Sequence, residues 1–524
     1  MSKKVKIIIV VVALSVLGAI SYFFQDGLIL KSVRNYAKSI SSSPQEIEIL
    51  VKKKDFKKIE EIREKSIEKG HIINEDSSYV DGKLVYNGDT LKIELRLKGH
   101  MLDHVKGEKW SYRIKVKKGK TFLGMKRFTL QHPGTRNYAY EWLYHKLMAH
   151  QGIISLNYDF IKVNFNGDNL GIYAVEEHFA QELAERNNRP NGPFMRFNPE
   201  NYWEGRYTRD ILKMRFHEEY SSYISSFPEF YDRKNTRNDS TLLNAYLKAQ
   251  NLLEQFKRNE LKTSEVFDVE LMAKFHAVID LIGGHHSLDW SDVKYYFNPE
   301  TNKIEPVAYE SVSAFETKKL CGSFQFFTLE KEALPVFHQQ LFSDTTFFKA
   351  YIQEVERISD ESYLKVFLKI YEEQLNEKLS VLYSEFPYKD FTTDIYFKNQ
   401  KIIKKMLAEP KPFNAFLQRY DTTNNTITVA LGSVSAFPYK VVSISCGSEI
   451  VSIPSLIIEC KQVQAHVNYN EYAFTATKAF LDKIKSEKLL KMQVQILGSS
   501  ETKSVEIADY PYAYKPKEKE IENE

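Results

Sequence analysis

The chain has 524 residues, of which 43% are hydrophobic and 13% aromatic. This composition supplies a large core, excludes an intrinsically disordered protein, and suits two or three domains. Lys and Arg number 73 against 69 Asp and Glu, a balance too even for a dedicated nucleic-acid-binding protein, so we expect no nucleic-acid partner.

The N-terminal 24 residues predict a membrane anchor. Lys3, Lys4 and Lys6 precede an apolar run over residues 7–24, which is long enough to cross a bilayer as a helix. Positive charge before the span places the N-terminus inside, so we expect a single-pass protein of the cytoplasmic membrane whose C-terminal part is extracytoplasmic. A cleaved signal peptide is the alternative. Residues 25–45, which become Ser-rich, are expected to form a tether.

Residues 46–190 are predicted to form a β-rich first lobe. A strand is expected over 46–51, followed by a charged helix over 55–69 that stops at Gly70. Turn signals at Asn87-Gly88 and Asn166-Gly167 each predict a hairpin. The remaining expected elements are strands over 79–98, 110–117, 128–130, 160–165 and 170–175, and helices over 137–150 and 180–186.

Alternation in the first-lobe strands places cations on the face opposite the apolar side chains. Lys98, Arg113 and Lys115 lie on that face. Such a face can hold a polyphosphate, and the exposed side of an ordinary antiparallel sheet is the alternative. Glu176, at the end of a predicted strand, would orient one of these cations or cap the following helix.

Residues 191–409 are predicted to form a helical second lobe. The linker-like passage 187–199 marks its start, and amphipathic patterns predict helices over 240–262, 266–281, 341–357, 362–383 and 395–407. After Pro410-Lys-Pro412 the pattern changes to short alternating runs, over 427–431, 439–445, 451–457 and 492–497. These runs predict a β-sandwich over residues 410–514, followed by a disordered tail over 515–524.

The cysteines and histidines give only weak evidence for a metal site or a disulfide bond. Cys321, Cys446 and Cys460 contain no CxxC pair, so they form neither a zinc set nor a disulfide framework. Cys446 and Cys460 would pair only in an exported protein, and buried free thiols are the alternative. His285 and His286 are adjacent, and adjacent side chains point apart on most backbones, which disfavours a shared metal.

The stretch 282–315 is the best candidate for chemistry. Asp289 and Asp292 precede a predicted strand over 293–297, and Glu310 follows its expected partner over 304–309. Acids at the outer ends of a hairpin can face each other and hold a divalent cation that carries phosphates. The alternative to a cation site is that these acids are ordinary solvent-exposed residues near turns.

These pieces, in this order, resemble the spore coat protein H (CotH) family of atypical secreted protein kinases. The resemblance rests on LRLKGH (95–100), KWSYRIKV (109–116), GMKRFTLQ (124–131), the helix with Glu141, FNGDNLGIYAVEE (165–177) and DWSDVKYYFNPETNKIEPVAYESVSAF (289–315). It implies an α+β, two-lobed, protein-kinase-like domain that binds ATP with Mg²⁺ or Mn²⁺ and phosphorylates Ser or Thr of an envelope or secreted partner.

The resemblance also implies roles for single residues. Asp289 falls on the first acid of the metal-binding segment, with Asp292 as the nearby alternative, and Glu310 falls on the Asp of the Trp-Asp pair. Arg113 and Lys115 lie on the strand near the nucleotide, and we add Lys98 to this group. Glu176 falls on the Glu at the end of the hairpin.

Two departures from the family pattern place catalysis in doubt. Val312 replaces a second Asp, and a valine cannot coordinate a cation; Lys294 replaces an Asn. Three hypotheses therefore stand. The first is a protein kinase of full or degenerate activity, and the second is a non-catalytic, pseudokinase-like envelope assembly or binding protein. The third is a glycan-active enzyme with Asp289 and Glu310 as its acid pair, which no motif in the sequence supports.

Overall fold

The structure is a computed structural model that describes residues 11–16, 18–19, 27–73, 75–213, 223, 225–323, 335–408, 411–453, 456–461, 466–487 and 489–509. None of the helices within these ranges combines the length and the apolar character needed to span a membrane. The predicted span over residues 7–24 lies partly outside the described residues, and the predicted disordered tail 515–524 lies wholly outside them.

The chain folds into two compact units. The first comprises residues 1–251, 282–315 and 362–397, and the second comprises residues 252–281, 316–361 and 398–524. All candidate site residues from the sequence fall in the first unit, which is therefore described first.

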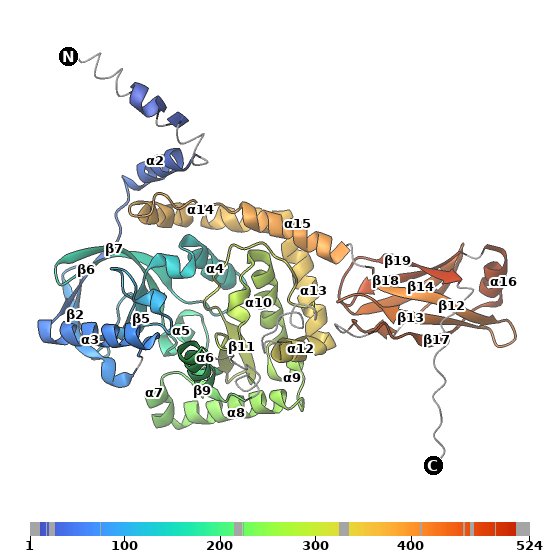
Figure 1. Ribbon diagram of the computed structural model, residues 1–524. Helices are drawn as coiled ribbons and strands as arrows, with labels where there is room; N and C mark the ends of the chain where they lie inside the picture. The colour runs from blue at the N-terminus through green and yellow to red at the C-terminus, as the bar shows by residue number, and fades with distance from the viewer. Residues whose placement is uncertain are drawn as a thin grey trace. The chain divides into compact units, whose positions relative to one another are not determined.

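Seven strands of the first unit close into a barrel, drawn in blue to teal in Figure 1. Their order is β1-β2-β3-β4-β5-β7-β6, and β1 completes the ring by pairing with β6 in parallel. Alternate residues fill the interior, as in β3, where Ile93, Leu95 and Leu97 are buried. The strands are β1 (Glu46–Val51), β2 (Val80–Tyr86), β3 (Asp89–Leu97), β4 (Tyr112–Val116), β5 (Arg127–Gln131), β6 (Tyr158–Phe165) and β7 (Asp168–Glu177).

Both predicted hairpin turns are confirmed. Asn87 and Gly88 have φ of 50° and 84°, and Asn166 and Gly167 have φ of 53° and 92°. Two successive positive φ angles are the type I′ geometry that matches strand twist, and Asn-Gly adopts it with little strain.

The predicted helices of the β-rich region are confirmed within two residues. They are α3 (Lys53–Lys69), α4 (Ala139–His150) and α5 (Gln181–Arg186). The expected tether contains a helix, α2 (Leu28–Ser39), and so does not form an extended linker throughout. Its side chains alternate between apolar and polar with a helical period, which a composition-based argument for a tether overlooked.

A second sheet of the first unit has the order β11-β10-β8-β9. The hairpin predicted around 293–309 is confirmed as β10 (Lys294–Asn298) and β11 (Lys303–Val307). The passage 187–199, expected to be a linker, contains β8 (Phe194–Phe197), which pairs with β10 and with β9 (Pro228–Phe230). The Gly and Pro residues of this passage indicated a linker, so the strand of four residues was not predicted.

The helices that follow the barrel agree in part with the helices predicted from apolar periodicity. The helix expected over 341–357 is two helices, because the Asp344 side chain accepts a hydrogen bond from Thr346 N (2.8 Å) and begins a new one. The helices are α6 (Glu200–Leu212), α7 (Arg233–Asn238), α8 (Ser240–Lys257), α9 (Thr263–Val266), α10 (Val269–Ile282), α12 (Pro335–Ser343), α13 (Thr345–Ser359), α14 (Glu361–Tyr383) and α15 (Asp394–Ala408).

The C-terminal β-structure belongs to the second unit. Its eight strands hydrogen-bond in the order β15-β14-β18-β19-β12-β13-β17, with β16 on β14. The β-sandwich expected over residues 410–514 stays a prediction. The four runs seen in the sequence underestimated the number of strands, and β12, β17 and β19 lie outside them. The elements are β12 (Phe413–Asp421), β13 (Thr426–Ser433), β14 (Tyr439–Cys446), β15 (Glu449–Ser452), β16 (Ile457–Ile458), β17 (Asn470–Thr475), α16 (Lys478–Glu487), β18 (Leu490–Ile496) and β19 (Lys503–Asp509).

Candidate active site

The loop that follows β11 carries Glu310 in a strained conformation. Glu310, Val312 and Ala314 have positive φ angles of 46°, 44° and 74°. Such conformations cost on the order of 1–3 kcal/mol each in non-glycine residues and persist only where neighbouring contacts fix them. The loop is therefore held by the structure around it.

Helix α4 and the turn before it supply those contacts. Ser311 N donates to both carboxylate oxygens of Glu141 (3.1 Å each), and Ser311 Oγ donates to the same carboxylate (2.6 Å). Asn137 Nδ2 donates to Ser313 O (2.8 Å). Burial raises the pKa of Glu141 to about 7, even though the Ser311 hydrogen bonds and the Arg136 charge favour its ionised form.

One side of Glu310 faces an acidic cluster. His286, Asp292 and Glu310 each place one ligand atom within 4.8 Å of the others. His286 Nε2 lies 3.8 Å from Asp292 Oδ2 and 3.9 Å from Glu310 Oε2. Burial and the Glu310 charge raise the pKa of Asp292 to about 6, against the lowering effect of Lys294 and His286. The cluster combines two carboxylates and an imidazole, a donor set suited to a divalent cation.

The other side of Glu310 is neutralised by the protein itself. Arg136 donates to Glu310 Oε1 in a close ion pair, and Lys98 Nζ lies 4.0 Å from the same oxygen. Burial alone would raise the pKa of Glu310, but the charges of Arg136 and Lys98 hold it well below its ordinary value. Glu310 therefore stays ionised, with one oxygen engaged and the other directed at His286.

Lys98 and Glu176 lie in one buried polar network. Lys98 Nζ donates to Gln131 Oε1 (2.7 Å), and Gln131 Nε2 donates to Glu176 Oε2 (2.6 Å). Lys98 Nζ is 4.0 Å from Glu176 Oε1, and Arg136 Nε is 3.8 Å from Glu176 Oε2. Burial lowers the pKa of Lys98 to about 8, although Glu176 opposes the change.

The outer face of the barrel gathers arginines. Arg96 on β3 lies directly opposite Arg113 on β4, although like charges in cross-strand register repel each other. Burial and the charges of Arg113, Arg127, Arg196 and Arg96 lower the pKa of His178 well below its ordinary value. Arg127 pairs with Asp232 and Arg196 with Glu229 (2.6 Å each).

Arg113 has a donor atom that is open to an anion. Its Nε is buried, and no hydrogen-bond partner for that atom lies within the described residues. Lys115, two residues on, lies with its Nζ 3.7 Å from the ring centroid of Tyr79 and is paired in register with Glu94. Arg113 therefore has a donor atom without a partner among the described residues, whereas the Lys115 ammonium already lies against the Tyr79 ring.

Comparison with known proteins assigns the family. The family model for CotH kinase protein matches residues 95–407, more than half of the chain. The chain belongs to the CotH kinase protein family. A search among curated proteins found no match. Membership confirms the resemblance seen in the sequence: the chain is kinase-like, and the family implies ATP and a divalent metal in general terms.

The CotH kinase domain brings together some of the predicted site residues. Glu310 and Asp292 share the acidic cluster, whereas Asp289 is not a member of it. The Asp289 carboxylate accepts from Ser291 N (3.3 Å) and Ser291 Oγ (3.2 Å), a local turn. Glu176 lies beside Lys98, as its position at a strand end suggested. The roles assigned to all of these residues stay predictions.

Sequence reasoning missed the residues that arrange Glu310. Arg136 follows a Pro-Gly turn, Gln131 ends β5, and His286 was set aside because it adjoins His285. A single polar side chain far away in sequence shows no periodic signal, so only the tertiary contacts reveal these partners.

The two departures from the family pattern are visible in this CotH kinase domain. Lys294 Nζ donates to Asp292 O and lies 4.7 Å from the ring centroid of Tyr309. Burial lowers the pKa of Lys294 to about 8, against the pull of Asp292. Val312 is a β-branched residue in the left-handed region, where it is strained and offers no ligand atom.

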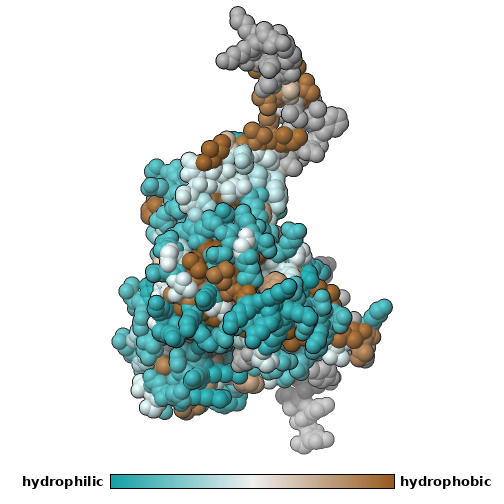
Figure 2. Space-filling model, turned by 90° about the vertical axis from the view of Figure 1, so that its left-hand side faces the viewer, coloured by the Kyte–Doolittle hydropathy of each residue, from teal (hydrophilic) through white to brown (hydrophobic). Residues whose placement is uncertain are grey.

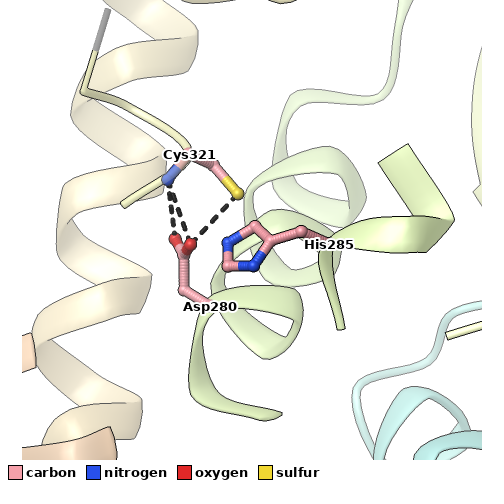
Figure 3. Close-up of side chains that lie close together, drawn as sticks. All are labelled: Asp280, His285 and Cys321. Carbon is pink, nitrogen blue, oxygen red and sulfur yellow. Dashed lines mark hydrogen bonds between the residues drawn. The ribbon is translucent and has the colours of Figure 1, made fainter. Parts of the chain in front are cut away.

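A separate buried carboxylate, that of Asp280, lies in the second unit. Asp280 accepts hydrogen bonds from Cys321 N (3.0 and 3.2 Å) and from Cys321 Sγ (3.1 Å), as Figure 3 shows, and from the Tyr351 hydroxyl. Burial raises the pKa of the Cys321 thiol well above its ordinary value, so this cysteine is not a ready nucleophile. These donors satisfy Asp280 and tie α10 to the segment that contains Cys321.

Proposed function

We propose that this protein transfers the γ-phosphoryl group of ATP to a Ser or Thr hydroxyl of an envelope or secreted protein. The observation that carries the proposal is the acidic cluster of His286, Asp292 and Glu310 in the same unit as the arginine face around Arg113. Phosphoryl transfer needs chiefly positioning and neutralisation of charge, which such an arrangement supplies.

The residues present fit a divalent cation. His286 Nε2, Asp292 Oδ2 and Glu310 Oε2 would hold Mg²⁺ or Mn²⁺, and the imidazole favours Mn²⁺ over the harder Mg²⁺. The metal, when bound, would neutralise charge on the phosphates of ATP. Arg136 would keep Glu310 ionised and in place, and Lys98 would add positive charge behind it.

Arg113 would bind a phosphate oxygen through its unused Nε, and the repulsion between Arg96 and Arg113 would fall when an anion lies between them. Glu176 would orient Lys98 directly and through Gln131. Lys115 stays a candidate for the same phosphates.

We place the protein in the cytoplasmic membrane, anchored through residues 7–24, with its C-terminal part extracytoplasmic. The support is the order of Lys3, Lys4 and Lys6 before an uncharged apolar run. Accessibility of the chain to protease added outside intact cells tests this placement, and full protection would contradict it.

A nucleotide-binding pseudokinase is the second candidate. It is favoured by Val312, which offers no ligand, and by the close pair of Arg136 with Glu310, which already neutralises one carboxylate. Such a protein would bind ATP and a partner without transferring phosphate.

Thermal unfolding of the full chain with and without ATP and Mn²⁺ separates these readings from a scaffold that binds no nucleotide. A ligand at one hundred times its Kd stabilises the folded state by about 2.7 kcal/mol, so we expect a clear rise in melting temperature. Arg113→Gln and Asp292→Asn should abolish that rise, whereas Lys57→Gln, on the exposed side of α3, should keep it. Labelled ATP then distinguishes transfer from binding alone, and absence of any stabilisation contradicts both candidates.

A further inference from the structure

Helix α2 is attached to the first unit by its polar side. Asn35 is 1% exposed, and its Nδ2 donates to Pro387 O (3.0 Å) and Lys389 O (3.4 Å). Ser39, one turn on, is also buried. Lys31 pairs with Asp390 (3.2 Å). The docked side of α2 is therefore formed by Asn35 and Ser39, with Lys31 at its edge.

The apolar side of α2 is largely exposed, and two of its residues also line a pocket beside Lys109 and Glu385. Val33, Tyr36 and Ile40 are 59%, 56% and 75% exposed, and their spacing of three and four residues places them on one stripe. A helix on the surface of a globular protein normally turns its apolar stripe to the core. In α2 the arrangement is inverted. Figure 2 shows hydrophobic residues gathered in the N-terminal part of the chain.

Two cations border this stripe. Arg34 and Lys38 are exposed and lie between the apolar side and the docked side, while Lys31 is engaged by Asp390. Before α2, Val11, Val12, Leu14 and Val16 are also more than half exposed. The described residues before α2 thus also carry exposed apolar side chains.

We propose that α2 lies in the interface of a lipid bilayer that contains anionic headgroups. Val33, Tyr36 and Ile40 enter the boundary between headgroups and acyl chains, and Arg34 and Lys38 contact the headgroup phosphates. The contacts of Asn35 and Lys31 with residues 387–390 then fix how the rest of the first unit is oriented relative to the membrane. The inference concerns the placement of the protein and does not depend on phosphoryl transfer.

The positive charge of Arg34 and Lys38 favours a lipid bilayer over a second copy of the chain as the occupant of this surface. A bilayer surface presents both an apolar layer and a row of negative charges, so it satisfies the stripe and its cationic border together. A second copy of α2 would bring Arg34 and Lys38 toward the same residues of its partner, and like charges repel.

An environment-sensitive fluorophore at position 33 tests the proposal. The full chain carries Val33→Cys in a Cys460→Ser background, because Cys321 and Cys446 are buried, and is mixed with phosphatidylcholine vesicles with or without phosphatidylglycerol. We expect the emission to shift to that of an apolar environment when the anionic lipid is present. A label at Lys65→Cys, on the exposed side of α3, should keep its aqueous emission.

Charge reversal supplies the matched control. Arg34→Glu with Lys38→Glu should lower the ratio of lipid-facing to water-facing label about 25-fold or more, because each cation near an anionic surface contributes a factor of about five. Lys54→Glu with Lys57→Glu, an equal change of charge on α3, should leave the ratio unchanged. Unaltered melting curves show that the variants fold.

Two results would overturn the proposal. One is an aqueous emission at position 33 while the protein sediments with the vesicles, which would mean that the membrane is reached by residues 7–24 alone. The other is a shift without vesicles that grows with protein concentration, which would assign the stripe to a second copy of the chain.

Discussion

Val312 is the single residue that most weakens the case for catalysis. It stands in the left-handed region with φ of 44°, and it falls on a family Asp. Asp tolerates this conformation better than a β-branched residue. We expect Val312→Asp to raise the melting temperature in Mn²⁺ and to create or increase transfer from labelled ATP.

The control for this change is Val312→Asn. It relieves the same backbone strain without adding charge, so it should raise stability whether or not metal is present. If Val312→Asp responds to Mn²⁺ no more than Val312→Asn does, position 312 is not a lost ligand.

Glu141, which binds the loop that carries Glu310, makes the free energy of unfolding depend on pH. Its pKa is about 7 in the folded state against 4.5 ordinarily. The folded protein therefore keeps a proton that the unfolded chain releases, so this group's contribution to stability is complete below pH 4.5 and is lost as pH rises to about 7. The full loss is about 3 kcal/mol. Glu141→Gln should flatten stability against pH in this window.

Denaturant unfolding at several pH values measures that slope. Glu185→Gln, exposed on α5, should leave it as in the original chain. Glu141→Ala should lower stability by about 1–3 kcal/mol at all pH values, because Ser311 N and Oγ lose their acceptor in a buried place. An equal slope in Glu141→Gln would show that the carboxyl does not titrate here.

At the scale of elements, one turn of the barrel also makes a contact with a strand that is distant in sequence. Asn166 Oδ1 accepts a hydrogen bond from Val51 N (2.8 Å), so the β6–β7 turn also fixes the end of β1. Asn87 has the same backbone conformation in the β2–β3 turn, with an exposed side chain. The two residues form a natural pair for comparison.

We expect Asn166→Ala to destabilise the protein by about 1 kcal/mol more than Asn87→Ala. Both changes place alanine at a positive φ, so that cost is shared, and the difference measures the bond to Val51. Chemical denaturation of the two variants gives the comparison. Equal losses would mean that water replaces the Asn166 acceptor at no cost.

The same scale shows why most elements could be predicted. Periods of two and 3.6 residues, with Gly and Asn at the turns, indicated β3, β4, α3 and the β6–β7 hairpin. β8 was missed because four residues carry too little pattern, and α12 and α13 were merged because apolar periodicity crosses the break at Asp344.

For the whole molecule, the cysteines make a simple prediction. All three are free, with Cys321 and Cys446 buried and Cys460 half-buried. The purified chain should have the same mass and mobility with and without reductant, and unfolding should expose three titratable thiols. A bond between Cys446 and Cys460, which we considered for an exported chain, would reduce that number to one.

The sequence by itself determined the kinase-like family, the order of most strands and helices, and the two ends of the hairpin that carry Asp292 and Glu310. Only the tertiary structure decided that Asp292 and His286, and not Asp289, share a cluster with Glu310, that Arg136 occupies its other oxygen, and that α2 presents its apolar side to the outside. The reason is physical: periodicity and turn chemistry act over a few neighbouring residues, whereas charge pairing and burial depend on which distant segments the fold brings within a few ångströms.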